Sequence, residues 1–192
     1  MPWPTTKKEL DAKLASFDWA AWEKKIHDAM DADRRAIADI QAEREATLHS
    51  LEWDVDDPFV DSFFTTYLAE RITQLNETTR DKVRGTLAGA IERGDTDLAA
   101  QLRDAYAFAP ARAEMVARTE TAIAYNHGQG LAFHQNGIEQ VEISDGDEDE
   151  ECAAADGEIW TVEEYLEEPI SHPNCTRAAA PVTPDEADTD EE

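Results

Sequence analysis

The spacing of apolar residues constrains the fold of this chain more than any other feature. Apolar side chains recur at three- and four-residue steps over four segments, at about residues 5–50, 58–75, 78–94 and 111–135. This spacing is that of one face of an α-helix, and each such face has to be buried against another element. The pattern therefore predicts a mainly α fold.

Residues that favour helix ends lie at the borders of these segments. Thr6 and Glu9 have the spacing of a capping box, and Asp18 can cap the helical segment that follows it. Pro58 stands where a proline fits the first turn of a helix, and Gly94 is suited to end one. We therefore expect helices to begin and end at these positions.

The periodicity changes after Gly137. Residues 138–143 alternate between apolar and polar and predict a short strand, and 158–161 predict a second one. A short helix is expected over 161–168, and residues 177–182 form a last extended piece. The C-terminal part of the chain is therefore expected to be a small α+β domain.

These patterns divide the chain into four parts. We predict an N-terminal helical arm, a helical region, a small α+β domain and a disordered acidic tail, at residues 1–53, 54–110, 111–182 and 183–192. The apolar stripe of the arm thins out among charged residues after Met30. The arm is then either a long solvated helix or a helix that binds a partner.

The chain is strongly acidic, with 44 Asp and Glu residues against 17 Lys and Arg and a formal net charge of −27. The runs 145–151 and 185–192 hold part of the excess, and such runs are typical of solvated loops and tails. Few cations are left to displace counterions from phosphates, so direct DNA binding is disfavoured at ordinary salt. The acidity fits either a halophilic host, whose salt screens the repulsion, or simply an acidic protein.

Neither a membrane span nor a secretion signal is expected. The sequence has no run of about 18 apolar residues, and its first residues lack the apolar core of a signal peptide. We therefore expect the protein to be made and to act first in a cytoplasm. Its 2 cysteines are then not expected to form a structural disulfide.

Polar side chains interrupt the helix expected over 111–135. An Arg and an Asn with a Glu in reach could bind a carboxylate or take part in acid–base chemistry. No nucleophile or paired carboxylate accompanies them, which favours a hydrogen-bonded network that fixes how the helix docks. The residues of this network are Arg118, Thr119, Glu120 and Asn126. His127 is expected on the surface of the helix.

Several short motifs follow one another in a fixed order along the second half of the chain. They are residues 112–128, Cys152, Asp156-Gly157, His172-Pro-Asn-Cys175 and Ala180-Pro-Val182. In this order and at these spacings, they resemble the C-terminal domain of the phage Mu F-like minor head proteins, a head morphogenesis family. With the segment 76–94, the resemblance covers about residues 54–182.

The resemblance also implies a metal site. Family members commonly carry Cys-x-x-Cys and His-Pro-x-Cys pieces, whose side chains would make a tetrahedral zinc site. Here Cys152, His172 and Cys175 match, whereas Asp149 stands in the place of the first cysteine and Arg177 in that of the last. The site is either a structural zinc site with Asp149 as an oxygen ligand or a degraded site with two buried cysteines.

The function that the resemblance implies is that of a minor capsid protein of a tailed virus or provirus, incorporated during head assembly. Such proteins are associated with the portal vertex and with genome packaging or delivery, so the expected location is the virion. Portal or major head proteins are the expected partners. Exposed aromatic side chains are predicted to contact them, namely Trp19, Trp22, Phe59, Phe63 and Phe64.

Two other functions stay open. One is a DNA-organising internal head protein, against which the charge of the chain argues. The other is a metal-dependent enzyme or toxin-related module, because the family domain is found attached to toxin domains in larger proteins. The sequence carries no catalytic signature that we recognise, so we expect a protein that is not an enzyme.

Overall fold

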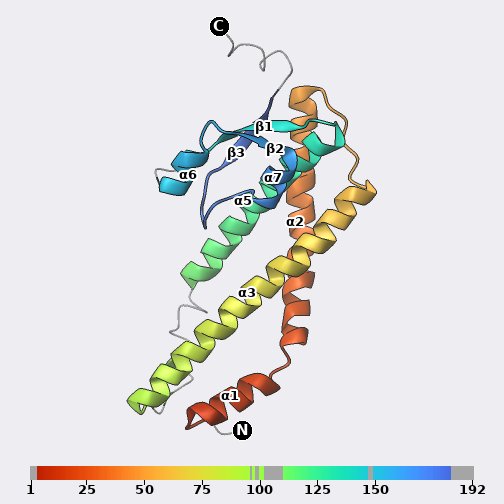
Figure 1. Ribbon diagram of the computed structural model, residues 1–192. Coiled ribbons are helices and arrows are strands. Elements are labelled where there is room, and N and C mark those ends of the chain that lie inside the picture. Colours follow the sequence, from red (N-terminus) through yellow and green to blue (C-terminus); the bar gives the residue numbers. More distant parts are fainter. Residues whose placement is uncertain (1–3, 96, 98–99, 102–109, 147–148, 183–192) are drawn as a thin grey trace. The chain divides into compact units, whose positions relative to one another are not determined.

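The computed structural model describes residues 4–95, 97, 100–101, 110–146 and 149–182. The elements are α1 (Lys7–Ser16), α2 (Trp19–His49), α3 (Pro58–Arg93), α5 (Pro110–Gln135), β1 (Gln140–Ser144), α6 (Glu150–Ala155), β2 (Ile159–Thr161), α7 (Val162–Glu167) and β3 (Ala178–Pro181) (Figure 1). The predicted mainly α fold with a small α+β C-terminal part is confirmed. Within the described ranges, no helix has the length and apolar character needed to cross a membrane. The tail at 183–192 lies outside these ranges.

The predicted helix ends are present. Thr6 Oγ1 accepts a hydrogen bond from Glu9 N at 3.2 Å, and Asp18 Oδ1 accepts one from Ala21 N at 2.9 Å. Gly94 follows the last residue of α3 and has a φ of 75°, in the left-handed region that favours glycine. Short polar side chains and one glycine therefore set these ends locally.

The two helices expected on either side of Thr78 are one continuous helix, α3, with Pro58 as its first residue. The predicted break is wrong because the two threonine hydroxyls bond within the helix. Thr78 Oγ1 donates to Gln74 O at 2.9 Å, and Thr79 Oγ1 donates to Leu75 O at 2.8 Å. Threonines that donate to the preceding turn are satisfied inside a helix and have no need to cap one.

The sequence predicts that the acidic run between the first two strands is a loop, but part of this run is helical. It leads into the short helix α6, which Asp149 caps: its Oδ1 accepts from the backbone N of Glu151 and of Cys152, each at 3.1 Å. Acidic side chains are also favoured in the first turn of a helix by the partial positive charge there. Through this helix Cys152 becomes fully buried.

The chain forms two compact units. The first combines Met1–Asp31 with Phe64–Glu114, and Leu10, Val83, Leu87 and Ala90 form a buried apolar cluster in it. The second combines Ala32–Phe63 with Met115–Glu192 and holds the sheet and the candidate site. The four domain boundaries proposed from the sequence stay a prediction.

In the second unit, the C-terminal half of α2 packs against α5. Its buried residues are Arg34, Ala38, Gln41, Ala42 and Glu45. This half of the helix is therefore no solvated arm. The approach is closest at Gly128, where an added Cβ atom would lie 2.1 Å from Ala38 O.

The sheet has the strand order β2-β1-β3, and both neighbouring pairs are antiparallel. Along β1, Val141 and Ile143 are buried and their neighbours are exposed, as expected for a strand with one face on a core. Asp145 continues this alternation just beyond the strand and is buried as well. The pleat of β1 therefore directs a carboxylate inward.

Side chains of α5 hold both α7 and the sheet, which gather at the C-terminal end of that helix (Figure 1). Gln129 Oε1 accepts from Tyr165 Oη of α7 at 2.9 Å and from Ala179 N of β3 at 3.2 Å. At Gly130 an added Cβ would lie 2.8 Å from Leu166 Cδ2. The absence of a side chain there permits α7 to come close to the helix.

The aromatic side chains predicted to contact partners differ in exposure. Trp22 is 37% exposed and Phe59 is 41% exposed, whereas Trp19 and Phe63 are half-buried. Phe64 is only 3% exposed. The predicted exposure of Phe64 is wrong, because its ring lies in the interior.

Candidate metal centre

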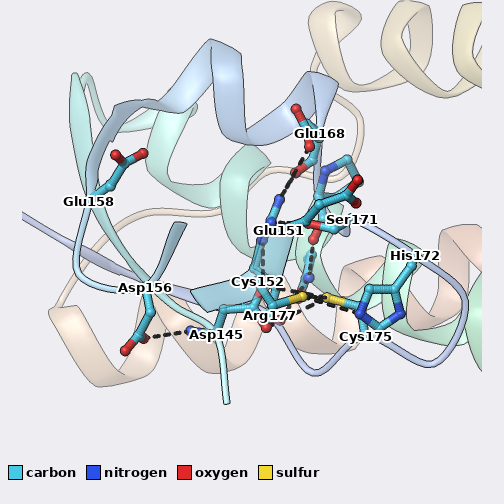
Figure 2. Close-up of polar contacts among 12 residues, drawn as sticks. Asp145, Glu151, Cys152, Asp156, Glu158, Glu168, Ser171, His172, Cys175 and Arg177 are labelled. Atoms are coloured by element: carbon cyan, nitrogen blue, oxygen red, sulfur yellow. Dashed lines mark hydrogen bonds and ion pairs between the residues drawn. The ribbon is translucent and has the colours of Figure 1, made fainter. Parts of the chain in front are cut away.

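Three side chains with metal-ligand chemistry meet in the second unit. Cys152, His172 and Cys175 each place one ligand atom within 4.8 Å of those of the others. Cys152 Sγ lies 3.8 Å from Cys175 Sγ and 3.2 Å from His172 Nε2, and Figure 2 shows the imidazole beside the two sulfur atoms. Both cysteines are free and buried. The structure thus brings together the three residues that match the family motif.

Two segments supply these residues, and local structure holds each of them. Cys152 lies near the start of α6, whose capping residue is Asp149. His172 and Cys175 lie in the loop between α7 and β3, where Cys175 N donates to His172 O at 3.1 Å. Asn174 within this turn has a φ of 66°, a conformation that asparagine tolerates better than most residues. The tight turn places the imidazole and the second thiol close together.

The spacing of the ligand atoms fits a tetrahedral ion. With Zn–S bonds of about 2.3 Å, two thiolates on one zinc ion lie about 3.8 Å apart. This is also the separation between Cys152 Sγ and Cys175 Sγ. Two thiolates and an imidazole suit zinc, whereas calcium and magnesium prefer oxygen ligands. The residues present therefore fit a structural zinc ion.

The hydrogen bonds of His172 orient its imidazole ring so that Nε2 faces the sulfur atom of Cys152. Its Nδ1 lies 3.0 Å from Pro173 O, and since a carbonyl can only accept, Nδ1 carries a proton in this contact. Nε2 faces Cys152 Sγ and, at 2.8 Å, Asp149 Oδ2. A metal ion, a proton on Nε2 or the thiol proton of Cys152 can lie between these atoms. Backbone carbonyls orient metal-binding histidines in the same way.

Two carboxylates border the three ligands. Asp149 is exposed and lies beside His172 Nε2. Asp145 is buried, lies 3.6 Å from Cys175 Sγ through Oδ2, and uses the same oxygen to accept from Arg177 Nε at 3.0 Å. Because the arginine already neutralises Asp145, Asp149 stays the candidate for a fourth, oxygen ligand.

Arg177, which the resemblance places at the last family cysteine, is only 4% exposed. Besides its bond to Asp145, its guanidinium donates to Glu168 O at 3.0 Å and to Ser171 Oγ (Figure 2). The guanidinium carbon also lies 4.8 Å from the centre of the Trp160 ring, a cation–π contact. An arginine cannot bind a metal ion here, but this one ties together the same loops that a fourth ligand would.

The surroundings of the site shift the pKa values of the Cys152 thiol and the Asp149 carboxylate in opposite directions. Burial, together with the nearby Asp149 and Asp145, raises the pKa of the Cys152 thiol. The hydrogen bond from the backbone N of Cys152 lowers the pKa of Asp149 to about 2. Without a metal ion, the site would thus hold a protonated thiol beside an ionised carboxylate. A zinc ion bound by Cys152 would displace the thiol proton, because coordination stabilises the thiolate.

Three of the four residues predicted to form one polar network contact different partners. Arg118 is exposed, and Thr119 Oγ1 donates to a carbonyl of its own helix at 2.8 Å. Glu120 is buried and pairs with Arg34 of α2. Asn126 Nδ2 donates to Pro169 O at 2.6 Å and to a second carbonyl of the same loop, at residue 177, at 2.9 Å. Of the four, Asn126 holds the loop that carries His172 and Cys175.

His127 is 1% exposed, so its predicted place on the helix surface is wrong. Its Nε2 lies 3.2 Å from Leu166 O of α7, and its ring makes an edge contact with Phe63 at a centroid distance of 4.8 Å. Burial, assisted by the positive charge of Arg34, lowers its pKa to about 3. The imidazole is therefore neutral in the folded protein at ordinary pH.

The buried His127 predicts a loss of stability in mild acid. Below pH 6.5 the unfolded chain gains a proton on this histidine and the folded chain does not, so the free energy of unfolding falls as the pH falls toward 3. The slope from this group is about 1.4 kcal/mol per pH unit. Urea unfolding between pH 7 and 5 should show a shallower fall for His127→Gln, and equal slopes would contradict the assignment.

Sequence reasoning missed several buried charged residues, among them Asp145 and Arg34. Asp145 is the centre of the contacts to Cys175 and Arg177, and Arg34 is the partner of Glu120. The alternation Val141, Ile143, Asp145 was a usable signal for the first, because it places the carboxylate on the buried side of the strand. No comparable signal exists for Arg34, since the thin apolar stripe of its helix predicts exposure.

The comparison with known proteins adds one finding. A family model described as "Phage Mu protein F like protein" matches residues 81–180. The match runs from within α3 to β3 and includes all three ligand residues of the candidate metal centre. No curated protein and no solved structure gives a significant match to the chain.

Proposed function

Because the chain belongs to the phage Mu protein F like family, we propose that it is a minor capsid protein of a tailed virus or provirus. The family is one of phage head morphogenesis proteins, structural rather than catalytic. In this proposal the protein joins the head during assembly, at or near the portal, and contributes to genome packaging or delivery. It ends up in the virion.

The observation that carries this proposal is the extent of the family match. More than half of the chain is matched, and the matched part contains α5, the sheet and the loops that meet at Cys152, His172 and Cys175. The likeness therefore concerns a folded module and not one short motif. A module of this kind, without a catalytic constellation among the described residues, suits a structural role.

Exposed aromatic residues support protein partners in the head. Trp22 on α2 and Phe59 on α3 leave 37% and 41% of their surface to solvent, and Trp19 and Phe63 are half-buried next to them in sequence. Large exposed aromatic side chains are typical of protein interfaces. The net charge of −27 favours such partners over direct contact with DNA.

The test of the proposal is the composition of purified particles. We expect this chain to be found in them in far fewer copies than the major head protein, by quantitative mass spectrometry. Its presence in infected or induced cells but absence from particles and from head intermediates would contradict the assignment.

A point variant tests the aromatic contact more cleanly than a deletion, because removing the whole N-terminal segment would also remove buried residues of α2. Trp22→Ala is expected to lower co-purification with the portal protein by about tenfold, as central interface tryptophans often do. Ile40→Ala is the matched control, since Ile40 is an exposed apolar residue of the same helix at 67% exposure. Equal capture of both variants would remove Trp22 from this role.

We also propose that the candidate metal centre holds a structural zinc ion. The three ligand atoms within 4.8 Å, the sulfur separation of 3.8 Å and the orientation of His172 support it. Bound there, zinc would pin α6 to the loop before β3. Cys152, His172 and Cys175 would hold it, with Asp149 in the fourth place.

The zinc proposal predicts about one zinc per purified chain, measured by atomic emission. Cys175→Ser should lose most of the metal. His27→Gln, which changes a histidine far in sequence from the metal centre, should keep it. A strong chelator should lower the melting temperature of the unaltered protein and leave that of Cys175→Ser unchanged. Metal-free protein with two reactive thiols and no response to the chelator would contradict the proposal.

A further inference from the structure

A cavity of about 450 Å³ lies where the α2–α3 connection meets the C-terminal end of α5, away from the metal centre. It is lined by Glu52, Trp53, Asp54, Asp57, Phe59, His134, Gln135 and Asn136, all within the second unit. We infer that this cavity binds an arginine side chain of a partner protein. The argument rests on its rigid frame, its aromatic wall and its uncompensated charge.

The frame of the cavity is held by two reciprocal amide contacts. Asn136 Oδ1 accepts from Glu52 N at 2.9 Å while its Nδ2 donates to Glu52 O at 2.7 Å. Gln135 does the same with Asp54, at 3.1 and 2.8 Å. Both amides bind the backbone of the connection and not its carboxylates, and Asn136 Nδ2 also donates to Ala132 O of α5 at 2.8 Å.

One wall of the cavity is aromatic. The rings of Phe59 and His134 are stacked with a centroid distance of 3.9 Å and an interplanar angle of 5°, yet Phe59 is still 41% exposed. The indole of Trp53 is held by its Nε1, which donates to Asp39 Oδ1 at 2.7 Å. Exposed aromatic faces attract cations, and the flat guanidinium group of arginine stacks on them.

Three carboxylates border the aromatic wall. Asp54 Oδ1 accepts from Asp56 N at 3.0 Å and Asp57 Oδ1 accepts from Phe59 N at 2.7 Å, which leaves a second oxygen on each. Among the described residues, no cationic side chain forms an ion pair with Asp54, Asp57 or Glu52. A guanidinium, with five donors in one plane, can stack on the wall and bond to carboxylates at its edge.

Charge complementarity selects the occupant. The chain is acidic overall at −27, and this cavity adds an uncompensated negative charge to an aromatic surface, so a basic side chain is the complementary partner. Arginine fits better than lysine because lysine carries a compact charge that cannot stack. The inference names a chemistry for the contact at Phe59 and rests on the proposed function only in assuming a protein partner.

The probe is N-acetyl-L-arginine amide, titrated into the full chain and followed by NMR. We expect shifts of the Trp53 indole N–H and of the Gln135 and Asn136 side-chain amides, with the neutral analogue N-acetyl-L-citrulline amide at least about tenfold weaker and the lysine analogue in between. Shifts spread over the whole acidic surface, or equal binding of citrulline, would overturn the inference.

Two double variants distinguish binding in this cavity from general attraction to the acidic surface. Glu52→Gln with Asp57→Asn should weaken the arginine probe about tenfold, and the asparagine keeps an oxygen that accepts from Phe59 N. Glu163→Gln with Glu167→Gln, two exposed residues of α7 outside the lining of the cavity, removes the same charge and should leave binding unchanged. Equal weakening by both pairs would overturn the inference. Since the isolated chain and a small probe are used, failure here leaves incorporation into particles untouched.

Discussion

Replacing Gly128 by alanine is expected to destabilise the second unit by at least about 3 kcal/mol or to prevent its folding. The added Cβ would lie 2.1 Å from Ala38 O and 2.8 Å from Ala38 C and Cα. These are backbone atoms of α2, so no side chain can turn away and the two helices would have to separate. Urea unfolding followed by circular dichroism measures the loss.

Gly85 provides the matched control in the same chain. It also lies inside a helix, α3, but an added Cβ would meet nothing within 4 Å. Gly85→Ala should therefore stabilise the protein by about 0.5–1 kcal/mol through helix propensity alone. If both substitutions had the same effect, the close contact between α2 and α5 at Gly128 would not exist in solution.

Replacing Arg177 by methionine is expected to cost about 3–5 kcal/mol, because it leaves the carboxylate of Asp145 buried without its cationic partner and only the weak contact of the Cys175 thiol remains. Both side chains are almost fully buried, at 1% and 0% exposure, and their atoms are 3.0 Å apart. The substitution also removes the donors to Glu168 O and Ser171 Oγ and the contact with Trp160. Unfolding followed by tryptophan fluorescence measures the loss.

Two further variants test whether the loss comes from the buried carboxylate that is left unpaired. Arg84→Met removes the exposed arginine that pairs with Asp11 and should change stability far less. Arg177→Met combined with Asp145→Leu removes both buried charges and should regain part of the stability lost in the single variant. A double variant less stable than Arg177→Met would contradict the cost that we assign to the unpaired carboxylate.

The contacts of Gly128 and Arg177 could be predicted from the sequence to different extents. Small residues on α5 indicate that another element comes close, but nothing in the order of residues selects Ala38 as the contact of Gly128. Arg177 is visible only as a departure from the family motif. Its ion pair with Asp145 joins residues 32 positions apart, and a pairing of this kind depends on how the strand and the loop fold back.

Helix and strand positions were largely predictable, since local chemistry decides them. Capping by Thr6 and Asp18, the start at Pro58 and the end at Gly94 follow from hydrogen-bonding capacity and backbone freedom within a few residues. The exceptions were also local in origin. Hydroxyls can bond back into their own helix, which joined two expected helices into α3, and Asp149 could cap a helix within an acidic run.

By itself, then, the sequence determined the helical class, the small sheet, the family motif and the identity of the three candidate ligands. Only the tertiary structure decided that one side of the C-terminal half of α2 is buried, that His127 and Phe64 lie inside, and that Asp145 meets Arg177 beside the thiols. The physical reason is the distance along the sequence over which each interaction acts. Periodicity and capping act over one or two turns of chain, whereas burial and ion pairing depend on which distant surfaces meet.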